Sequence, residues 1–374
     1  MDDWAGRHRS GEIGHIPVFS TGCGMSALKL GVNLFIRKMN ELSRSESQAW
    51  DDLHAAASDL NQAFLSRTYI GHVASVNPDV RILVGYDNGA PTFFMPLQPR
   101  HGFVSRFGVF EPAGDVMTDY FGVVAGRGTR LSPAHLLAAT RGQINAILFT
   151  HLDQAQARFG LEGDEQRIGL RTRLGTPADD YWACLRRTDK KLVTDTERRE
   201  KKLHNEVGSV SFEWRSTALK ADLDWLIEAK KSQYSRTGKT HAALFETANV
   251  ELLKRLSGAS EAECGGVLSL LRCDDKIVAA HFGLQCRNVL HVWFPVYDRK
   301  FANYSPGRIL LKHMFAAAAH EGIEVFDRGE GDSQAKRDFA NDEHYYSNGL
   351  WLTPGLRGRL ASLAISVAWR MGNA

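Results

Sequence analysis

The alternation of apolar and polar positions along the chain predicts two α/β blocks. In the first, from about residue 47 to residue 180, strand-like runs at residues 80–86 and 92–97 flank the turn sequence Asp87-Asn88-Gly89. Asn-Gly between two such runs is typical of a β-hairpin. Apolar residues at helical spacing predict a helix around Trp50, and Ser132-Pro133 is a typical helix start.

The second block, from about residue 209 to residue 351, has the clearer pattern. Its predicted elements follow the order β-α-α-β-β-β-α-β-α-β. They are residues 210–215, 219–234, 250–256, 266–272, 276–285, 289–297, 305–320, 323–327, 333–340 and 345–352. Short strands joined by tight turns and interleaved with helices indicate an α/β fold with a mixed sheet.

Three segments lie outside the two predicted domains, which span residues 46–184 and 208–354. Residues 1–45 are predicted to be a tail, with a short strand at residues 33–38. Residues 185–207 are rich in arginine and lysine interspersed with acids, which predicts one long polar linker helix. Residues 355–374 are predicted to form a C-terminal amphipathic helix, which could contact anionic lipid or a lipid-linked sugar, although an ordinary surface helix has the same pattern.

Composition narrows the class of protein. A length of 374 residues favours two domains, and 43% hydrophobic with 24% charged residues is ordinary for a globular chain. The net charge of +3 gives no general case for a nucleic-acid binder. Five scattered cysteines without a CxxC pair argue against a zinc site and against a disulfide framework. With no long apolar run or basic signal peptide, the expected location is the cytoplasm, and no metal is expected.

The predicted strand at residues 289–297 ends in Pro295-Val296-Tyr297. Proline has no amide hydrogen for a sheet ladder, so it marks a bulge or an edge. The order of three consecutive strands followed by a strand–loop–helix unit resembles the GNAT fold, and this resemblance implies a bulged strand in front of the long helix, with pantetheine lying along it like an extra strand. An ordinary edge-strand proline would explain the residue equally well.

A second candidate site is the helix start in the run Tyr304-Ser305-Pro306-Gly307-Arg308. The first amides of a helix lack internal partners and carry the positive end of the dipole, so small residues there can admit a pyrophosphate. Ser305 could cap the helix, Gly307 clears space, and Arg308 could meet a phosphate. Plain helix capping remains the alternative.

The candidate acid–base residues lie in the same predicted block as these two sites. His281 lies in the middle of a predicted strand and could be a general base, or a hydrogen-bonded core histidine. Residues 326–339 form a polar, glycine-containing segment at a strand's C-terminal end, where sites of α/β folds usually lie. Within it, Asp332 could take a proton or only cap the following helix, whereas His291 is interpreted as structural.

These pieces together resemble the GNAT acetyltransferase family named after the cellulose-biosynthesis protein CelD (BcsL-like). The resemblance rests on residues 278–284 and 304–307, and on Phe326-Asp327 with Gly331-Asp332 and Lys336-Arg337. In the first block it includes Pro96-Leu97 and Asp119-Tyr120. It implies two tandem GNAT-like (acyl-CoA N-acyltransferase) modules, the first degenerate, as in Fem-type peptidoglycan aminoacyl transferases.

The family motif Gly-Asp-x-x-Tyr-Lys adds a further expectation. Asp332 and Lys336 match it, whereas Ala335 replaces its tyrosine, so that any role of the tyrosine is absent or moved, for instance to Tyr345 or Tyr346. The resemblance thus implies a catalytic set of His281, Asp332 and Lys336, with acetyl-CoA or another acyl-CoA as co-substrate.

The leading hypothesis is acyl transfer, most simply N-acetyl transfer, to a sugar-nucleotide or lipid-linked saccharide in envelope or exopolysaccharide synthesis. The acceptor is expected between the two blocks, where Arg198, Arg199, Lys201 and Lys202 of the linker could hold a diphosphate. One alternative is a Fem-like transferase that uses aminoacyl-tRNA and contacts it through the basic linker. The other is a GNAT-like scaffold without catalysis.

Overall fold

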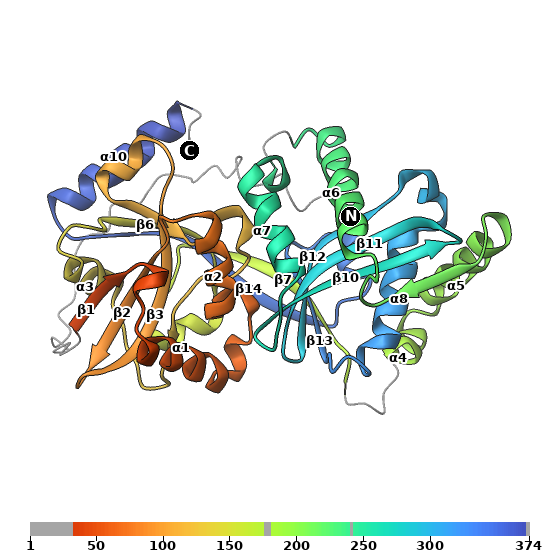
Figure 1. Cartoon of the computed structure of the whole chain (residues 1–374), viewed down its shortest axis with the longest axis horizontal. Helices are drawn as coiled ribbons and strands as arrows, with labels where there is room; N and C mark the ends of the chain where they lie inside the picture. Colours follow the sequence, from red (N-terminus) through yellow and green to blue (C-terminus); the bar gives the residue numbers. More distant parts are fainter. Residues whose placement is uncertain (1–32, 176–180, 240–241, 372–374) are drawn as a thin grey trace.

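The structure is a computed structural model that describes residues 33–175, 181–239 and 242–371 (Figure 1). The predicted tail before residue 33 and the last three residues of the predicted C-terminal segment lie outside this range. Figure 1 shows two halves side by side, with α10 at the outer end of the first half and α5 at the outer end of the second.

One continuous sheet runs through both halves of the described chain. Its strands are β1 (Asn33–Arg37), β2 (Arg81–Asp87), β3 (Ala90–Pro99), β4 (Val109–Pro112), β5 (Val124–Ala125), β6 (Ala146–Asp153), β7 (Glu165–Arg173), β8 (Val210–Glu213), β9 (Ser260–Glu261), β10 (Cys264–Cys273), β11 (Lys276–Cys286), β12 (Val289–Tyr297), β13 (Val325–Glu330) and β14 (Asp342–Leu352). The spatial order is β1-β2-β3-β4-β6-β14-β7-β13-β12-β11-β10-β8, with β5 beside β3 and β9 beside β10.

Helices cover both faces of this sheet. They are α1 (Arg44–Ala56), α2 (Arg67–Val76), α3 (Pro133–Ala139), α4 (Tyr181–Thr188), α5 (Lys190–Glu206), α6 (Leu219–Arg236), α7 (Thr247–Ser257), α8 (Pro306–Ala318), α9 (Gln334–Arg337) and α10 (Leu356–Arg370). In the second half, α6 and α7 form an apolar core with side chains on one face of the sheet. Helices α4, α5 and α8 form a second core with the side chains that point to the other face of the same strands. The predicted α/β fold, a mixed sheet flanked by helices, is confirmed.

The last strand of the chain belongs to the first half of the sheet. β14 lies between β6 and β7, with Leu352 opposite Ala146 and Asp342 opposite Arg171. The other edge of β7 pairs antiparallel with β13, which joins the two halves. Neither half therefore completes its sheet without strands from the other part of the chain.

Several local predictions agree with the structure. The hairpin is formed by β2 and β3, and its turn residues Asn88 and Gly89 have φ values of 50° and 81°, as an Asn-Gly turn requires. The strand near residue 33 is β1, which pairs with β2, so the described part of the predicted tail belongs to the sheet. The succession of strands and helices in the second half follows the predicted order.

One local prediction is wrong. The charged segment forms two helices, because the Asp189 side chain accepts a hydrogen bond from the Leu192 amide and starts α5 anew after α4.

Of the two alternatives predicted for Pro295, a bulge or an edge, the structure has the edge. The bulge in β12 lies at Trp293, since Phe282 faces Phe294 and Gly283 faces Val292. Pro295 lies in register opposite His281 two residues later, where β12 no longer pairs with β13.

The strand exchange generates a prediction about fragments. Residues 188–374 expressed alone would leave β14 without both neighbours and β13 without β7, because open strand edges associate or aggregate. We expect this fragment to elute as aggregate in size-exclusion chromatography and to lack a cooperative thermal transition by circular dichroism.

Co-expression with residues 33–187 should restore a soluble 1:1 complex. A monomeric fragment with a cooperative transition like that of the full chain would contradict the importance of the exchange.

Candidate active site

A gap opens in the sheet where β12 and β13 part. The two strands pair in parallel only over Val289–His291 and Val325–Asp327. The bulge at Trp293 lies two residues after His291, the last residue of β12 that pairs with β13, and a bulge bends the strand that carries it. The second part of β12 therefore presents an edge to the gap that no strand of the described chain covers.

A cavity fills this gap. The atom-free space in this cavity and at its open mouth is about 890 Å³. Its walls come from α6, β11, β12, the first turns of α8 and the segment from β13 to α9. The lining residues are Lys230, Ala280, His281, Val292, Trp293, Pro295, Val296, Gly307, Leu310, Leu311, Met314, Arg328, Glu330, Gly331, Asp332, Ser333 and Lys336.

Six of the nine predicted site residues meet in this cavity. They are His281, Pro295, Val296, Gly307, Asp332 and Lys336. The other three, Tyr297, Ser305 and Arg308, are not among its lining residues. Arg308 forms ion pairs with Asp338 at 3.1 Å and Asp195 at 3.6 Å. Ser305 has left-handed backbone angles at the start of α8, and its side chain makes no cap hydrogen bond.

His281 lies on the cavity wall without hydrogen-bond partners. Its side chain is buried, at 1% exposure, and neither ring nitrogen has a partner in the described protein. Burial, together with the nearby charge of His291, lowers the pKa of His281 to about 3, so the ring is neutral at pH 7. An added Cβ at Gly283 would lie 2.6 Å from Nε2 of His281, so glycine there leaves room for the ring.

Two cations of the β13–α9 segment, buried Arg328 and half-buried Lys336, donate hydrogen bonds to its carbonyls. The Arg328 guanidinium donates to the carbonyls of Ala335 and Lys336, at 3.1 and 2.9 Å, and so ties α9 to β13. The Lys336 ammonium donates to the carbonyls of Gly329 and Glu330. Burial lowers the pKa of Arg328 to about 10, and burial together with Arg328 lowers that of Lys336 to about 8. Lys336 can therefore exchange a proton near neutral pH.

Glu330 brings the first half of the molecule to the cavity. Its Oε2 lies 3.0 Å from Nε2 of His151, a buried residue of β6. The other ring nitrogen of His151 lies 2.9 Å from Oγ1 of Thr150. His151 has a φ of +58°, a left-handed conformation that is uncommon for a side-chain-bearing residue and is often found at functional sites.

Comparisons with known proteins agree with this geometry. Residues 190–337 match the family model described as an acetyltransferase (GNAT) domain. This part of the chain is a GNAT-type acyltransferase domain. The match contains β12, the start of α8 and the segment up to Lys336, and thus every residue that lines the cavity.

Solved structures resemble the chain over most of its length. FemX does so with a TM-score of 0.53 and 11% identity, covering 85% of this chain and 98% of that one. The C-terminal domain of a putative lysylphosphatidylglycerol synthetase from Agrobacterium fabrum gives 0.50 and 12%, covering 86% and 96%. A tandem GNAT protein of the clavulanic acid pathway gives 0.44 and 12%, covering 85% and 98%. No curated protein matches the sequence.

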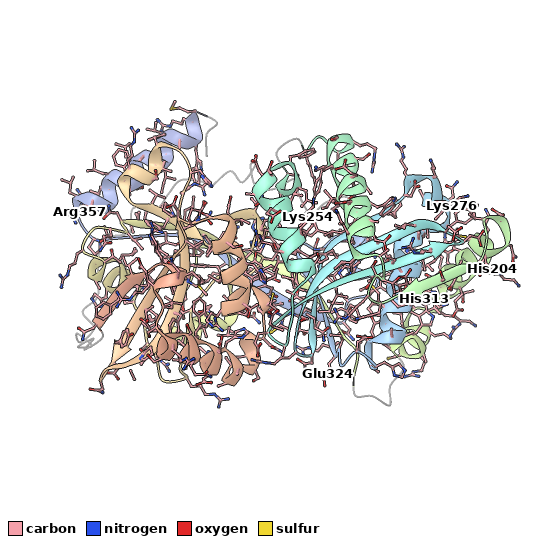
Figure 2. The ribbon with its side chains drawn as sticks, viewed as in Figure 1. His204, Lys254, Lys276, His313, Glu324 and Arg357 are labelled. Atoms are coloured by element: carbon pink, nitrogen blue, oxygen red, sulfur yellow. The ribbon has the colours of Figure 1, made fainter. Side chains whose placement is uncertain are left out.

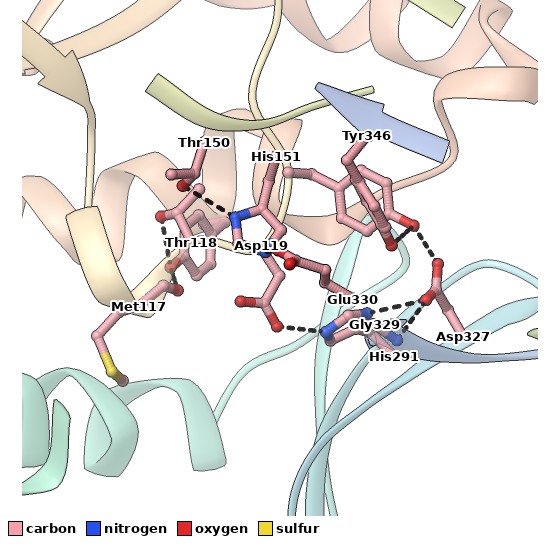
Figure 3. A network of polar contacts seen from close by, with 12 residues as sticks. Met117, Thr118, Asp119, Thr150, His151, His291, Asp327, Gly329, Glu330 and Tyr346 are labelled. Atoms are coloured by element: carbon pink, nitrogen blue, oxygen red, sulfur yellow. Dashed lines mark hydrogen bonds and ion pairs between the residues drawn. The ribbon is translucent and has the colours of Figure 1, made fainter. Parts of the chain in front are cut away.

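A buried polar cluster joins the GNAT domain to the first half (Figure 3). His291 of β12 lies between two carboxylates, with Nε2 2.8 Å from Asp119 and Nδ1 3.6 Å from Asp327. Asp327 also accepts hydrogen bonds from Arg171 of β7 at 3.1 Å and from the Tyr120 hydroxyl, and its other oxygen accepts from the Gly329 amide. The sequence singled out Asp119-Tyr120 without showing this contact.

The cluster holds its charges through mutual pairing. Burial opposes ionisation of Asp327, yet Arg171 and His291 outweigh it and hold the pKa of Asp327 well below its usual range. Burial likewise opposes the charge on His291, but Asp119 and Asp327 raise its pKa to about 9. His291 is therefore protonated at pH 7, which supports its structural interpretation.

The two tyrosines proposed to replace the motif tyrosine lie elsewhere. Tyr346 is buried and bonds the Tyr120 hydroxyl at 2.8 Å, while Tyr345 bonds Glu343 at 2.8 Å. Neither is among the cavity-lining residues. Asp332, although in the lining, is exposed and forms a 2.7 Å ion pair with Arg337.

The sequence interpretation missed three charged lining residues. Arg328 and Glu330 lie in the polar segment that it singled out, but nothing in that pattern distinguishes buried from exposed charges. Lys230 continues the apolar face of α6 three residues after Ile227 and is buried, with its ammonium 2.8 Å from the Pro295 carbonyl. A lysine at an apolar helical position is the signal that could have identified it.

We predict that Asp327→Asn destabilises the protein by about 3–5 kcal/mol, because it leaves Arg171 and His291 buried with one counter-charge fewer. The free energy of unfolding from urea titration at pH 7 measures this. Glu165→Gln, which removes an exposed partner of Arg167, is the matched control and should change little.

The pH dependence gives a second readout of the same variant. Because the pKa of His291 is raised, its contribution is complete below pH ~6.5 and is lost as pH rises through about 9. Wild-type stability should decline over this range, and Asp327→Asn should reduce the decline. An unchanged decline would mean that Asp327 does not hold the proton on His291.

Proposed function

We propose that this GNAT-type acyltransferase takes its acyl group from acetyl-CoA or another acyl-CoA bound in the gap between β12 and β13. The observation that carries the proposal is that an uncovered strand edge and a helix start line the same cavity. The amides of pantetheine can pair with a strand edge as an extra strand would. Gly307 in the first turn of α8 leaves space for the pyrophosphate close to the helix dipole.

The charged helix α5 supports CoA over tRNA as the donor. Three of its six lysines and arginines form ion pairs within the helix: Arg198 and Arg199 with Asp195 at 2.7 Å, and Lys202 with Glu206 at 3.8 Å. Helix α5 also packs against α8, at the end of the molecule away from the first half (Figure 1). The expectation that these arginines hold the acceptor between the halves is therefore wrong.

For the acceptor we propose the amine or hydroxyl of a sugar precursor of the cell envelope or an exopolysaccharide. The support is the resemblance to the CelD (BcsL-like) family, in which Asp332 and Lys336 match the motif. We place its entry on the side of the cavity where Glu330 meets His151, since this is where the first half reaches the donor site.

In the proposed reaction, the acceptor nitrogen or oxygen attacks the thioester carbonyl carbon and the carbon–sulfur bond breaks. Glu330, held by His151, takes the proton that leaves the acceptor. The Lys336 ammonium gives a proton to the departing thiolate, a role suited to its pKa of about 8. His281, which is neutral, can donate one N–H to the developing oxyanion, and Asp332 lies at the exposed rim.

A direct test of donor binding uses the helix start. Acetyl-CoA at 100 times its Kd should stabilise the wild type by about 2.7 kcal/mol and raise its Tm. Gly307→Glu puts a negative charge where the pyrophosphate should lie, and we expect it to abolish the Tm increase.

Gly128→Glu is the matched control, because an added Cβ at Gly128 meets nothing within 4 Å and this position lies in the first half. The proposed phosphate position is wrong if acetyl-CoA raises the Tm of Gly307→Glu as much as that of the control.

The role of Lys336 predicts a pH–rate profile. As the acid is the protonated form, kcat should fall as pH rises through about 8. Lys336→Met should lower kcat by on the order of 10²–10⁴, whereas Lys336→Arg, which stays protonated, should move the alkaline fall to higher pH.

Lys276→Met, which changes an exposed lysine at the start of β11, controls for the loss of a surface charge (Figure 2). A rate that rises through pH 8 would instead make Lys336 the base, and an unchanged profile in Lys336→Arg would remove it from the reaction.

A further inference from the structure

Helix α10 packs against the first half through small residues. Its inner face consists of Gly358, Ala361, Ala364, Ile365 and Ala368. The alanines and Ile365 form an apolar core with Val104, Val109 and Ala146. Ile365 is thus buried. This inner face accounts for the packing of α10 on the protein, but it does not explain which residues lie on the outer face.

The outer face carries an apolar stripe. Leu356, Leu360, Leu363 and Val367 are 72%, 43%, 61% and 38% exposed. Their spacings of four, three and four residues place them on one line along the helix. We call these four residues the α10 stripe. Single exposed apolar residues are normal, but a continuous row on one helix face marks a contact surface.

Arginines flank the α10 stripe on both sides. At about 100° per residue, Arg359 and Arg370 project along one flank and Arg357 along the other. The helix contains no acidic residue. The neighbouring turn η4 (Phe103–Phe107), which packs against α10, adds exposed Arg106 and Phe107. Figure 2 shows Arg357 at the outer end of the first half, far from His204 of α5.

We propose that α10 is a docking surface for an anionic lipid bilayer. A helix with an apolar stripe between basic flanks lies in the plane of a membrane surface, with the stripe in the acyl boundary and the arginines at lipid phosphates. The inference concerns a face of the molecule other than the donor site and does not depend on it.

A second copy of this chain fits the surface less well. If two α10 helices packed through their stripes, their arginine flanks would meet, and no carboxylate on either helix could pair with them. An anionic lipid surface supplies the opposite charge along both flanks. Since α10 has 15 residues and three arginines, it would lie on the bilayer; among the residues described, no helix is long and apolar enough to cross one.

The test is co-sedimentation of the full chain with vesicles of phosphatidylcholine alone and of phosphatidylcholine mixed with phosphatidylglycerol. We expect binding to the anionic vesicles only, weakening with added salt. Leu360→Gln with Leu363→Gln should lower the partition coefficient at least tenfold. Arg359→Gln with Arg370→Gln should lower it by a similar factor, since each arginine near the surface contributes roughly fivefold.

Lys190→Gln with Lys191→Gln, exposed lysines at the start of α5, is the matched control and should bind like wild type. Circular dichroism and the acetyl-CoA-induced rise in Tm confirm that each variant stays folded, and keep a failure here separate from a failure of the donor site. The proposal is overturned if the wild type does not co-sediment with anionic vesicles. So does binding that survives both α10 variants, and so does a dimer that the leucine variant dissociates in sedimentation velocity without any vesicle binding.

Discussion

The carboxylate of Asp327 lies in the interior, and several features of the fold are arranged around it. A buried charge is costly unless it is paired and hydrogen-bonded. Arg171 and Tyr120 from the first half and His291 from the second supply the partners. Asp327 is also the last residue of β13 that pairs with β12. The residue that joins the halves thus lies where the gap between β12 and β13 begins, so the position of this gap depends on the contact between the halves.

Short-range features of this fold could be predicted from the sequence, because they depend on neighbours in the chain. The β2–β3 hairpin follows from Asn88-Gly89, and the start of α8 follows from Ser305-Pro306-Gly307. Six of nine site residues also meet in one cavity. His281, Pro295 and Val296 lie on the consecutive strands β11 and β12, and the other three lie in the elements that follow these strands in the chain.

Long-range pairings could not be predicted. In β7 the charged residues occupy alternate positions, as in a strand with one polar face: Glu165, Arg167, Arg171 and Arg173. Nothing in this local pattern shows that the strand lies between β13 and β14. Glu330 of β13 contacts His151 of β6 only because β7 and β14 lie between these two strands in the sheet. Asp119 contacts His291, which is 172 positions away in the sequence. The sequence pattern also does not show that the Lys230 ammonium donates a hydrogen bond to the Pro295 carbonyl of β12.

The place of β14 has a consequence for biosynthesis. While the ribosome is still making the chain, β6 and β7 emerge long before β14, the strand that lies between them, has been translated. The first half therefore cannot close its sheet until β14 has emerged, and two strand edges stay unpaired during that time. Nascent chains with open edges associate readily, so this protein depends on chaperone protection more than its ordinary composition suggests. Chains of this length usually fold domain by domain from the N-terminus, but here the first half cannot complete its fold before β14 is made.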